Sequence, residues 1–237
     1  MDTKIRKAQN EILGVFVKEA KGFALAGGTA LELYYLHHRF SRDLDFFSPE
    51  YDVKEIERLI SAFEKRIKNK IKLQSEFAIK GRARVRFYIV PVKSLRAPFK
   101  IDFVEEVIFS KPHIKRIKGV RVYSAEDIYL QKIIAVAGMK PAIDETGREI
   151  IEGGRREARD AFDIYMLSKK IKPLHLFLKS VPRYLQRGIV HWYRSFSRQE
   201  MKLGLLDLDI YDKKFNSKEM ITYLENEIKK FAKGFVV

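Results

Sequence analysis

The hydrophobic pattern of the 237-residue chain changes once, near Tyr123, and this change limits the fold more than any other feature. Before Tyr123, apolar residues alternate between the 3.6-residue spacing of helices and the short runs or two-residue spacing of strands. After it, the spacing is almost entirely that of helices. We therefore predict an α+β protein, with a mixed β-sheet flanked by helices over residues 1–123 and a helical domain over residues 124–237.

The expected elements follow from the spacing of apolar residues and from the turn and capping signals between them. Helices are expected over residues 5–16, 30–35, 53–68, 124–137, 155–169, 173–193 with a break at Pro182, and 217–230. Strands are expected over residues 23–26, 43–46, 72–79, 84–90, 100–104, 114–117 and 120–123. Residues 139–154 have the pattern of an extended linker.

Composition restricts the class of protein. The absence of cysteine excludes disulfides, thiolate zinc sites and cysteine nucleophiles. The formal net charge of +16 favours a polyanionic partner such as RNA, DNA or a nucleotide, although a solvated basic surface would give the same value. Without an apolar leader at the N-terminus or a run of about 20 apolar residues, we expect a cytoplasmic protein with no membrane partner.

Three aspartates form the main candidate site. Asp43 and Asp45 are one residue apart in a predicted strand, so their side chains share one face, and Asp102 lies in a second predicted strand. If these strands are neighbours, the three carboxylates converge. Such a set could hold two Mg²⁺ ions about 3.5–4 Å apart, or Mn²⁺ in their place, which is suited to nucleotidyl transfer. The alternative is that the Asp-x-Asp sequence forms a solvated strand edge.

A glycine turn lies upstream of these aspartates. Gly27 and Gly28 would let backbone N–H groups approach phosphate oxygens, and Thr29 could add a hydroxyl donor. Arg39 and Arg42 could contact phosphates as well. The alternatives are a simple tight turn for the glycines and ordinary ion pairing with the nearby aspartates for the arginines.

Residues 26–31 (AGGTAL) and 38–47 (HRFSRDLDFF) closely resemble the first motif of the AbiEii/AbiGii-type nucleotidyltransferase toxin family, and more broadly the DNA polymerase β-like nucleotidyltransferases. Residues 100–103 resemble the strand that carries the third carboxylate of the family, and residues 159–165 resemble its Arg-Asp-x-x-Asp segment. The linker over residues 139–154 is longer than the compact connection expected in the family. The resemblance implies a nucleotidyltransferase-like sheet, catalytic and metal-binding roles for Asp43, Asp45 and Asp102, and nucleotide binding by Gly27, Gly28, Thr29, Arg39, Ser41, Lys132 and Asp160.

Lys132 has a second interpretation. Its ammonium could reach a phosphate, or it could form an interhelical salt bridge with Asp160 or Asp163, which are three residues apart on one helical face. His37 and His38 are adjacent and lack the spacing of a two-histidine metal site, so we assign them no catalytic role.

The expected activity is transfer of a nucleoside monophosphate from an NTP to a hydroxyl group of a macromolecule, with release of pyrophosphate. The resemblance implies RNA, particularly tRNA, as the acceptor, and an antitoxin as a partner. Three alternatives stay open: an enzyme that modifies a protein hydroxyl, a non-catalytic nucleotide-binding or RNA-binding module, and a protein that acts by sequestration.

Overall fold

The computed structural model describes residues 3–78, 83–92, 98–138, 140–143, 147, 149–152 and 154–233, and the chain divides into two compact units. The first unit comprises Met1–Tyr35 and Phe40–Ser124, and the second comprises Leu36–Arg39 and Ala125–Val237. The second unit therefore contains two separate segments of the chain, the four residues Leu36–Arg39 and all residues after Ser124.

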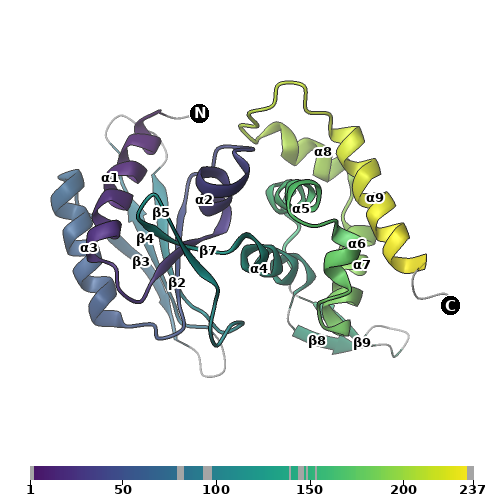
Figure 1. Cartoon of the computed structure of the whole chain (residues 1–237), viewed down its shortest axis with the longest axis horizontal. Helices are drawn as coiled ribbons and strands as arrows, with labels where there is room; N and C mark the ends of the chain where they lie inside the picture. The colour runs from purple at the N-terminus through teal and green to yellow at the C-terminus, as the bar shows by residue number, and fades with distance from the viewer. Residues whose placement is uncertain are drawn as a thin grey trace. The chain divides into compact units, whose positions relative to one another are not determined.

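The first unit is built on a mixed β-sheet, as predicted. Within the described residues the sheet has seven strands in the order β3-β4-β5-β2-β1-β7-β6 (Figure 1). The pairs β2/β5 and β1/β7 are parallel, and the other neighbouring pairs are antiparallel. The strands are β1 (Ala24–Ala26), β2 (Leu44–Ser48), β3 (Lys72–Phe77), β4 (Val85–Val90), β5 (Phe99–Glu105), β6 (Ile114–Ile117) and β7 (Val120–Tyr123).

Two amphipathic helices, α1 (Thr3–Glu19) and α3 (Val53–Ile67), lie along one face of this sheet (Figure 1). The ring of Phe46 on β2 stacks on Phe16 of α1 with centroids 4.2 Å apart and lies 6.3 Å from Phe63 of α3. These rings lie in the core between the helices and the sheet. Burial of such large apolar side chains is the main contribution to the stability of the fold. The short helix α2 (Gly27–Leu31) follows β1 and continues into a π-helical turn, η1 (Glu32–Leu36).

The second unit is mainly helical. Tyr129 of α4 stacks on Phe177 of α6 with centroids 4.0 Å apart, and Pro182 precedes α7 at the predicted break. The helices are α4 (Ala125–Ala137), α5 (Ala158–Lys170), α6 (Leu174–Leu178), α7 (Arg183–Ser195), α8 (Arg198–Leu206) and α9 (Ser217–Lys233). In the part of the chain that the structure describes, no helix is long and apolar enough to cross a membrane.

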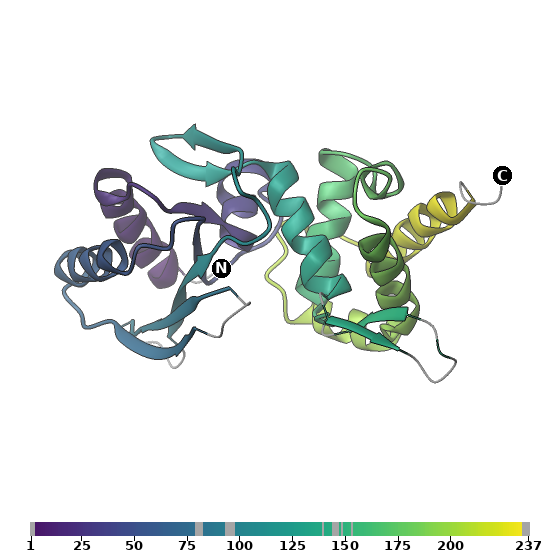
Figure 2. The ribbon, with the colours of Figure 1, turned by 90° about the horizontal axis from the view of Figure 1, so that it is seen from below.

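The described part of residues 139–154, predicted to be an extended linker, contains two strands. Strands β8 (Lys140–Ile143) and β9 (Glu149–Glu152) form an antiparallel hairpin there, seen beside the helices in Figure 2. The hairpin packs near α7, so its stability depends on contacts with a segment distant in sequence. Two four-residue strands are too short to show a clear two-residue alternation.

Candidate active site

Asp45 and Asp102 occupy directly opposite positions on the neighbouring parallel strands β2 and β5. On both strands the residues flanking the aspartate are buried, whereas the aspartate is partly exposed. Since successive side chains on a strand point to opposite faces, and Phe46 packs against α1 and α3, the two carboxylates lie on the other face of the sheet. The structure thus brings two of the three predicted carboxylates side by side.

Asp43 lies just before β2 and has a different environment. Its Oδ1 accepts a hydrogen bond of 3.0 Å from the backbone N–H of Lys100 on β5, and its backbone carbonyl accepts one from the Thr29 hydroxyl. Among the described residues there is no group of three or more His, Cys, Asp or Glu side chains that could hold a metal ion. A single metal site shared by all three aspartates therefore stays a prediction.

The Asp45 carboxylate lies against Gly27, at the turn between β1 and α2. Gly27 has a φ of +66°, and a Cβ added there would lie 2.0 Å from Oδ2 of Asp45. A side chain at this position would therefore collide with the carboxylate as well as strain the backbone. The predicted turn is real, and its first glycine allows the acidic side chain to approach closely.

The other predicted residues of this turn are buried. Gly28 and Thr29 lie inside the first unit, and the Thr29 hydroxyl is used by the Asp43 carbonyl. This contact fixes the backbone where β2 begins. Phosphate binding by Gly27, Gly28 and Thr29 stays a prediction, and the contact seen for Thr29 is a positioning one.

Buried polar side chains hold the backbone leading into β2. Gln9 on α1 donates from Nε2 to the carbonyls of Ser41 (3.0 Å) and Arg42 (2.6 Å). Glu32 accepts from the N–H of Ser41 at 2.8 Å, and Arg6 pairs with Glu32. We call Arg6, Gln9 and Glu32 the backbone clamp. Ser41, predicted to bind nucleotide, is itself held through its backbone.

Sequence reasoning did not identify the clamp. A signal for Gln9 was present, because it shares the buried stripe of α1 with Ile5, Ile12 and Phe16. A polar side chain on such a stripe needs a hydrogen-bonding partner to offset its desolvation. For Glu32 the sequence offers no comparable signal, since its partner Ser41 is reached only through the fold.

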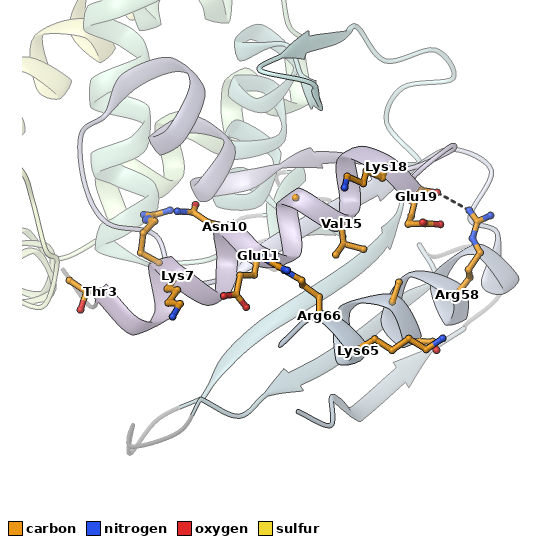
Figure 3. Close-up of a pocket in the computed structure, with 14 residues that line it drawn as sticks. Thr3, Lys7, Asn10, Glu11, Val15, Lys18, Glu19, Arg58, Lys65 and Arg66 are labelled. Carbon is orange, nitrogen blue, oxygen red and sulfur yellow. Dashed lines mark hydrogen bonds between the residues drawn. The ribbon is translucent and has the colours of Figure 1, made fainter. Parts of the chain in front are cut away.

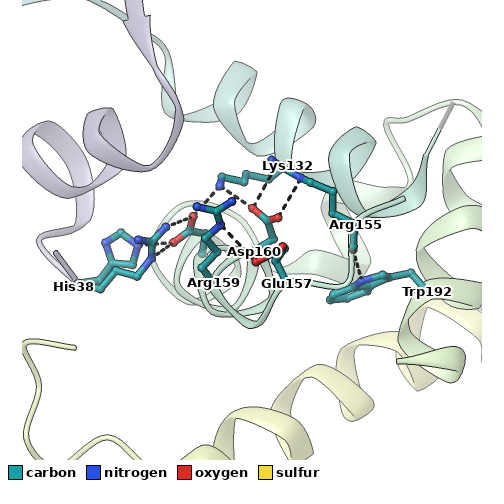
Figure 4. A network of polar contacts seen from close by, with 9 residues as sticks. His38, Lys132, Arg155, Glu157, Arg159, Asp160 and Trp192 are labelled. Carbon is teal, nitrogen blue, oxygen red and sulfur yellow. Dashed lines mark hydrogen bonds and ion pairs between the residues drawn. The ribbon is translucent and has the colours of Figure 1, made fainter. Parts of the chain in front are cut away.

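A buried charged network that includes His38, Lys132 and Asp160 lies in the second unit (Figure 4). Its centre is Asp163 of α5. Arg39 makes a two-point contact with it, Nε to Oδ1 at 2.7 Å and a terminal nitrogen to Oδ2 at 2.8 Å. His38 Nε2 lies 2.8 Å from Oδ1. Lys132 of α4 places Nζ 2.8 Å from Asp163 Oδ2 and 2.7 Å from Asp160 Oδ1. Thus the predicted residues Arg39, Lys132 and Asp160 are brought together.

The ionisation of this network follows from its pairing. Burial by itself would raise the pKa of Asp163, but the charges of Arg39 and Lys132 and the hydrogen bond from His38 hold that pKa well below its usual range. Burial would likewise lower the pKa of Lys132, but Asp160 and Asp163 raise it. Asp163 and Lys132 are therefore held in their charged forms.

These contacts realise the interhelical salt bridge that was the alternative interpretation of Lys132, since Lys132 lies on α4 and Asp160 and Asp163 lie on α5. Arg39 pairs with Asp163 across the second unit. The ammonium and the guanidinium are thus engaged by carboxylates. Nucleotide binding by Arg39, Lys132 and Asp160 stays a prediction, and the observed contacts are those of a structural network.

The same fold occurs in two solved structures from Helicobacter pylori. One is a protein provisionally named a nucleotidyltransferase and the other is JHP933; each has 20% sequence identity and a TM-score of 0.58. The alignments cover 98% of this chain, with 96% of the first structure and 94% of the second. At this identity the likeness establishes the fold alone, a mixed sheet flanked by helices and followed by a helical unit.

Residues 12–235 match the family described as nucleotidyl transferase AbiEii toxin, type IV toxin–antitoxin system. The match covers most of the chain, which therefore belongs to this family and is an enzyme of the nucleotidyltransferase class. No curated protein sequence matches the chain. The resemblance carried by residues 26–31 and 38–47 is confirmed.

Proposed function

We propose that this enzyme transfers a nucleoside monophosphate from an NTP to a hydroxyl group of RNA, using Asp45 and Asp102, with Asp43, as its catalytic carboxylates. One observation carries the proposal: Asp45 and Asp102 are directly paired on adjacent parallel strands and share one sheet face. Family membership supplies the reaction class, and the paired carboxylates supply the position at which it would occur.

The chemistry of the acidic residues fits a divalent cation. Carboxylate oxygens are the ligands that Mg²⁺ prefers, and two adjacent carboxylates repel each other unless a cation lies between them. Asp45 and Asp102 would hold the ion or ions, with Asp43 two residues from Asp45 as the third ligand. When bound, Mg²⁺ or Mn²⁺ would polarise the reacting phosphate and neutralise charge on the leaving pyrophosphate.

Other residues of the first unit would position these carboxylates. Gly27 leaves room for the Asp45 carboxylate, while Thr29 and Gln9 hold the backbone on the N-terminal side of β2. Catalysis of this kind depends on charged groups held in place before the reaction, because reorganising them during the reaction raises the barrier. The Gly27–Gly28 turn lies against the Asp45 carboxylate, and we infer that it also lies beside the triphosphate.

RNA as the acceptor is supported by charge. The chain carries 47 Lys and Arg against 31 Asp and Glu, and phosphate neutralisation is the main source of affinity for nucleic acids. The family description places its members in type IV toxin–antitoxin systems, so we also propose an antitoxin as the partner of this enzyme.

The test is nucleotide transfer by Asp45→Asn and Asp102→Asn variants, incubated with each labelled NTP, Mg²⁺ and total cellular RNA or protein. We expect each change to lower transfer by about 10²-fold or more, because a transition-state charge contact is lost. Asp52→Asn is the matched control, since Asp52 caps α3 on the same unit and Asn caps equally well. Near-parental transfer by both folded variants would overturn the proposal, and label in protein alone would replace RNA as the acceptor.

A further inference from the structure

A groove of about 1210 Å³ runs between α1 and α3, on the outer side of these helices (Figure 3). Its walls come from successive turns of the two helices, for example Lys7 and Lys18 on α1 and Arg58 and Lys65 on α3. Because α1 and α3 cover the sheet face that carries Phe46, the groove lies on the side of the sheet away from Asp45 and Asp102. It is therefore separate from the candidate active site.

The groove is strongly basic. Of the fourteen residues that line it, six are Lys or Arg and two are Glu. Arg6 is engaged by Glu32, and Arg58 donates to the carbonyl of Glu19 at 2.8 Å. The other four cations are exposed and form no ion pair with another described residue: Lys7, Lys18, Lys65 and Arg66.

Small residues keep the groove open. Gly14 on α1 has nothing within 4 Å of the position that a Cβ would occupy, and Ala62 faces the groove from α3. A glycine inside a helix is destabilising relative to alanine. No packing contact in the described residues requires Gly14 to lack a side chain. The absence of a side chain at Gly14 leaves space between the cationic side chains.

We propose that this groove binds the phosphate backbone of the acceptor RNA, an inference that rests on the function proposed above. Lys7 and Lys18 are eleven residues apart on one helix, which at 1.5 Å per residue is roughly 16 Å, the span of several consecutive phosphates. Phosphate contacts are made by exposed Lys and Arg side chains and do not require an apolar surface. A second hollow shares Lys7 and Arg66 and continues the basic surface to Lys68.

The lining favours RNA over an acidic protein. Protein interfaces are enriched in aromatic residues and arginine and depleted of lysine. The described residues that line this groove include no aromatic, three lysines and three arginines, and both lysine and arginine contact phosphates. Because the groove is remote from the carboxylates, it would anchor a part of the RNA distant from the reacting hydroxyl. Loss of its charges should therefore raise the KM for RNA more than it lowers kcat.

The experiment compares two triple variants that lose the same charge. Lys7→Gln/Lys18→Gln/Lys65→Gln alters the groove, and Lys213→Gln/Lys214→Gln/Lys218→Gln alters exposed lysines of the second unit. Binding of total tRNA is measured by fluorescence anisotropy over a range of salt, with Asp45→Asn added to both to prevent turnover. We expect the groove variant to bind at least about tenfold more weakly, with a salt slope reduced by about 2, and the control to stay within about twofold of the parent.

Unchanged binding by the groove variant, or equal weakening of both variants, would overturn the groove proposal, as would failure of the parent to bind RNA. Gly14→Glu provides a second test, because it places a negative side chain in open space within the groove and should weaken tRNA binding without unfolding α1. The two proposals can fail separately. Binding of RNA through the groove without transfer to RNA would overturn only the proposed function. Transfer to RNA with an unchanged KM in the groove variant would overturn only the proposal that the groove binds RNA.

Discussion

At the scale of single residues, the closest constraint is the contact between Gly27 and the Asp45 carboxylate. A methyl group at residue 27 would lie 2.0 Å from Oδ2 and would have to adopt a φ of +66°. Either the carboxylate or the turn must move. Because displacement of a catalytic group by about 1 Å can cost about 10²-fold in rate, we expect Gly27→Ala to lower transfer by about that factor.

Gly147→Ala is the matched control for Gly27→Ala, because Gly147 also has a positive φ, of +78°, but has nothing within 4 Å of the position that a Cβ would occupy. This change should preserve transfer and lower the free energy of unfolding by about 1–2 kcal/mol, the cost of a left-handed conformation at alanine. Transfer is measured with the labelled NTP assay and stability by urea unfolding. Equal transfer by the two alanine variants would show that the contact between Gly27 and Asp45 has no part in activity.

At the scale of secondary structure elements, α1 positions the start of β2 through Gln9. We expect Gln9→Leu to leave the carbonyls of Ser41 and Arg42 without this donor and to lower the free energy of unfolding by about 1–3 kcal/mol. The rate of transfer should fall by more than the loss of folded protein explains, because Asp43 and Asp45 come directly after the backbone that Gln9 holds. The measurement is kcat at saturating NTP, at a temperature where the variant is fully folded.

The chain offers a close control for this change in the second unit. Gln186 also donates from Nε2 to two backbone carbonyls, of Leu178 at 2.9 Å and Val181 at 3.0 Å. Gln186→Leu should destabilise the protein by a comparable amount while leaving kcat near the parental value. A similar loss of kcat in both variants would indicate that only stability is involved.

At the scale of the whole molecule, the second unit incorporates the segment Leu36–Arg39 that precedes β2 in the chain. His38 and Arg39 reach Asp163, and the N–H of Tyr211 donates to the carbonyl of His38 at 3.1 Å. Asp163 thus joins a distant segment to α4 and α5 by buried charge pairs. Removing one partner of such a pair leaves the others uncompensated, which is strongly destabilising.

We expect Asp163→Asn to lower the free energy of unfolding by about 3–5 kcal/mol near neutral pH. Because the pKa of Asp163 is lower in the folded than in the unfolded protein, its contribution is present above the unfolded value of about 4 and is lost as the pH falls below it. Denaturant unfolding at a series of pH values should therefore show a smaller loss on acidification in the variant than in the parent.

Asp207→Asn is the control for Asp163→Asn, because Asp207 is an exposed carboxylate of the same unit. It should change neither the stability near neutral pH nor its dependence on acid by more than about 0.5 kcal/mol. Equal effects of the two substitutions would contradict the role given to the buried network.

Much of the molecule follows from local sequence patterns. The alternation of polar and apolar residues around Asp45 and Asp102 indicated strands with one buried face. Glycine indicated the turn at Gly27, and the spacing of apolar residues indicated the helices before and after it in the chain. These features are local because the two-residue and 3.6-residue periods belong to the elements themselves. The family resemblance came from the same short segments.

The tertiary structure decided which residues that are distant in the sequence lie side by side. The sequence could not specify that Asp45 pairs with Asp102, that Gln9 reaches Ser41, or that Arg39 pairs with Asp163, which is 124 residues away. Strand order and register depend on which faces are buried together and on backbone hydrogen bonds between distant segments. A short hairpin such as β8–β9 depends on its neighbours in the same way. The sequence by itself therefore determined the candidate carboxylates and most of the elements, though not β8, β9 or α8. The pairing of the carboxylates and the contacts that support them were decided by long-range packing.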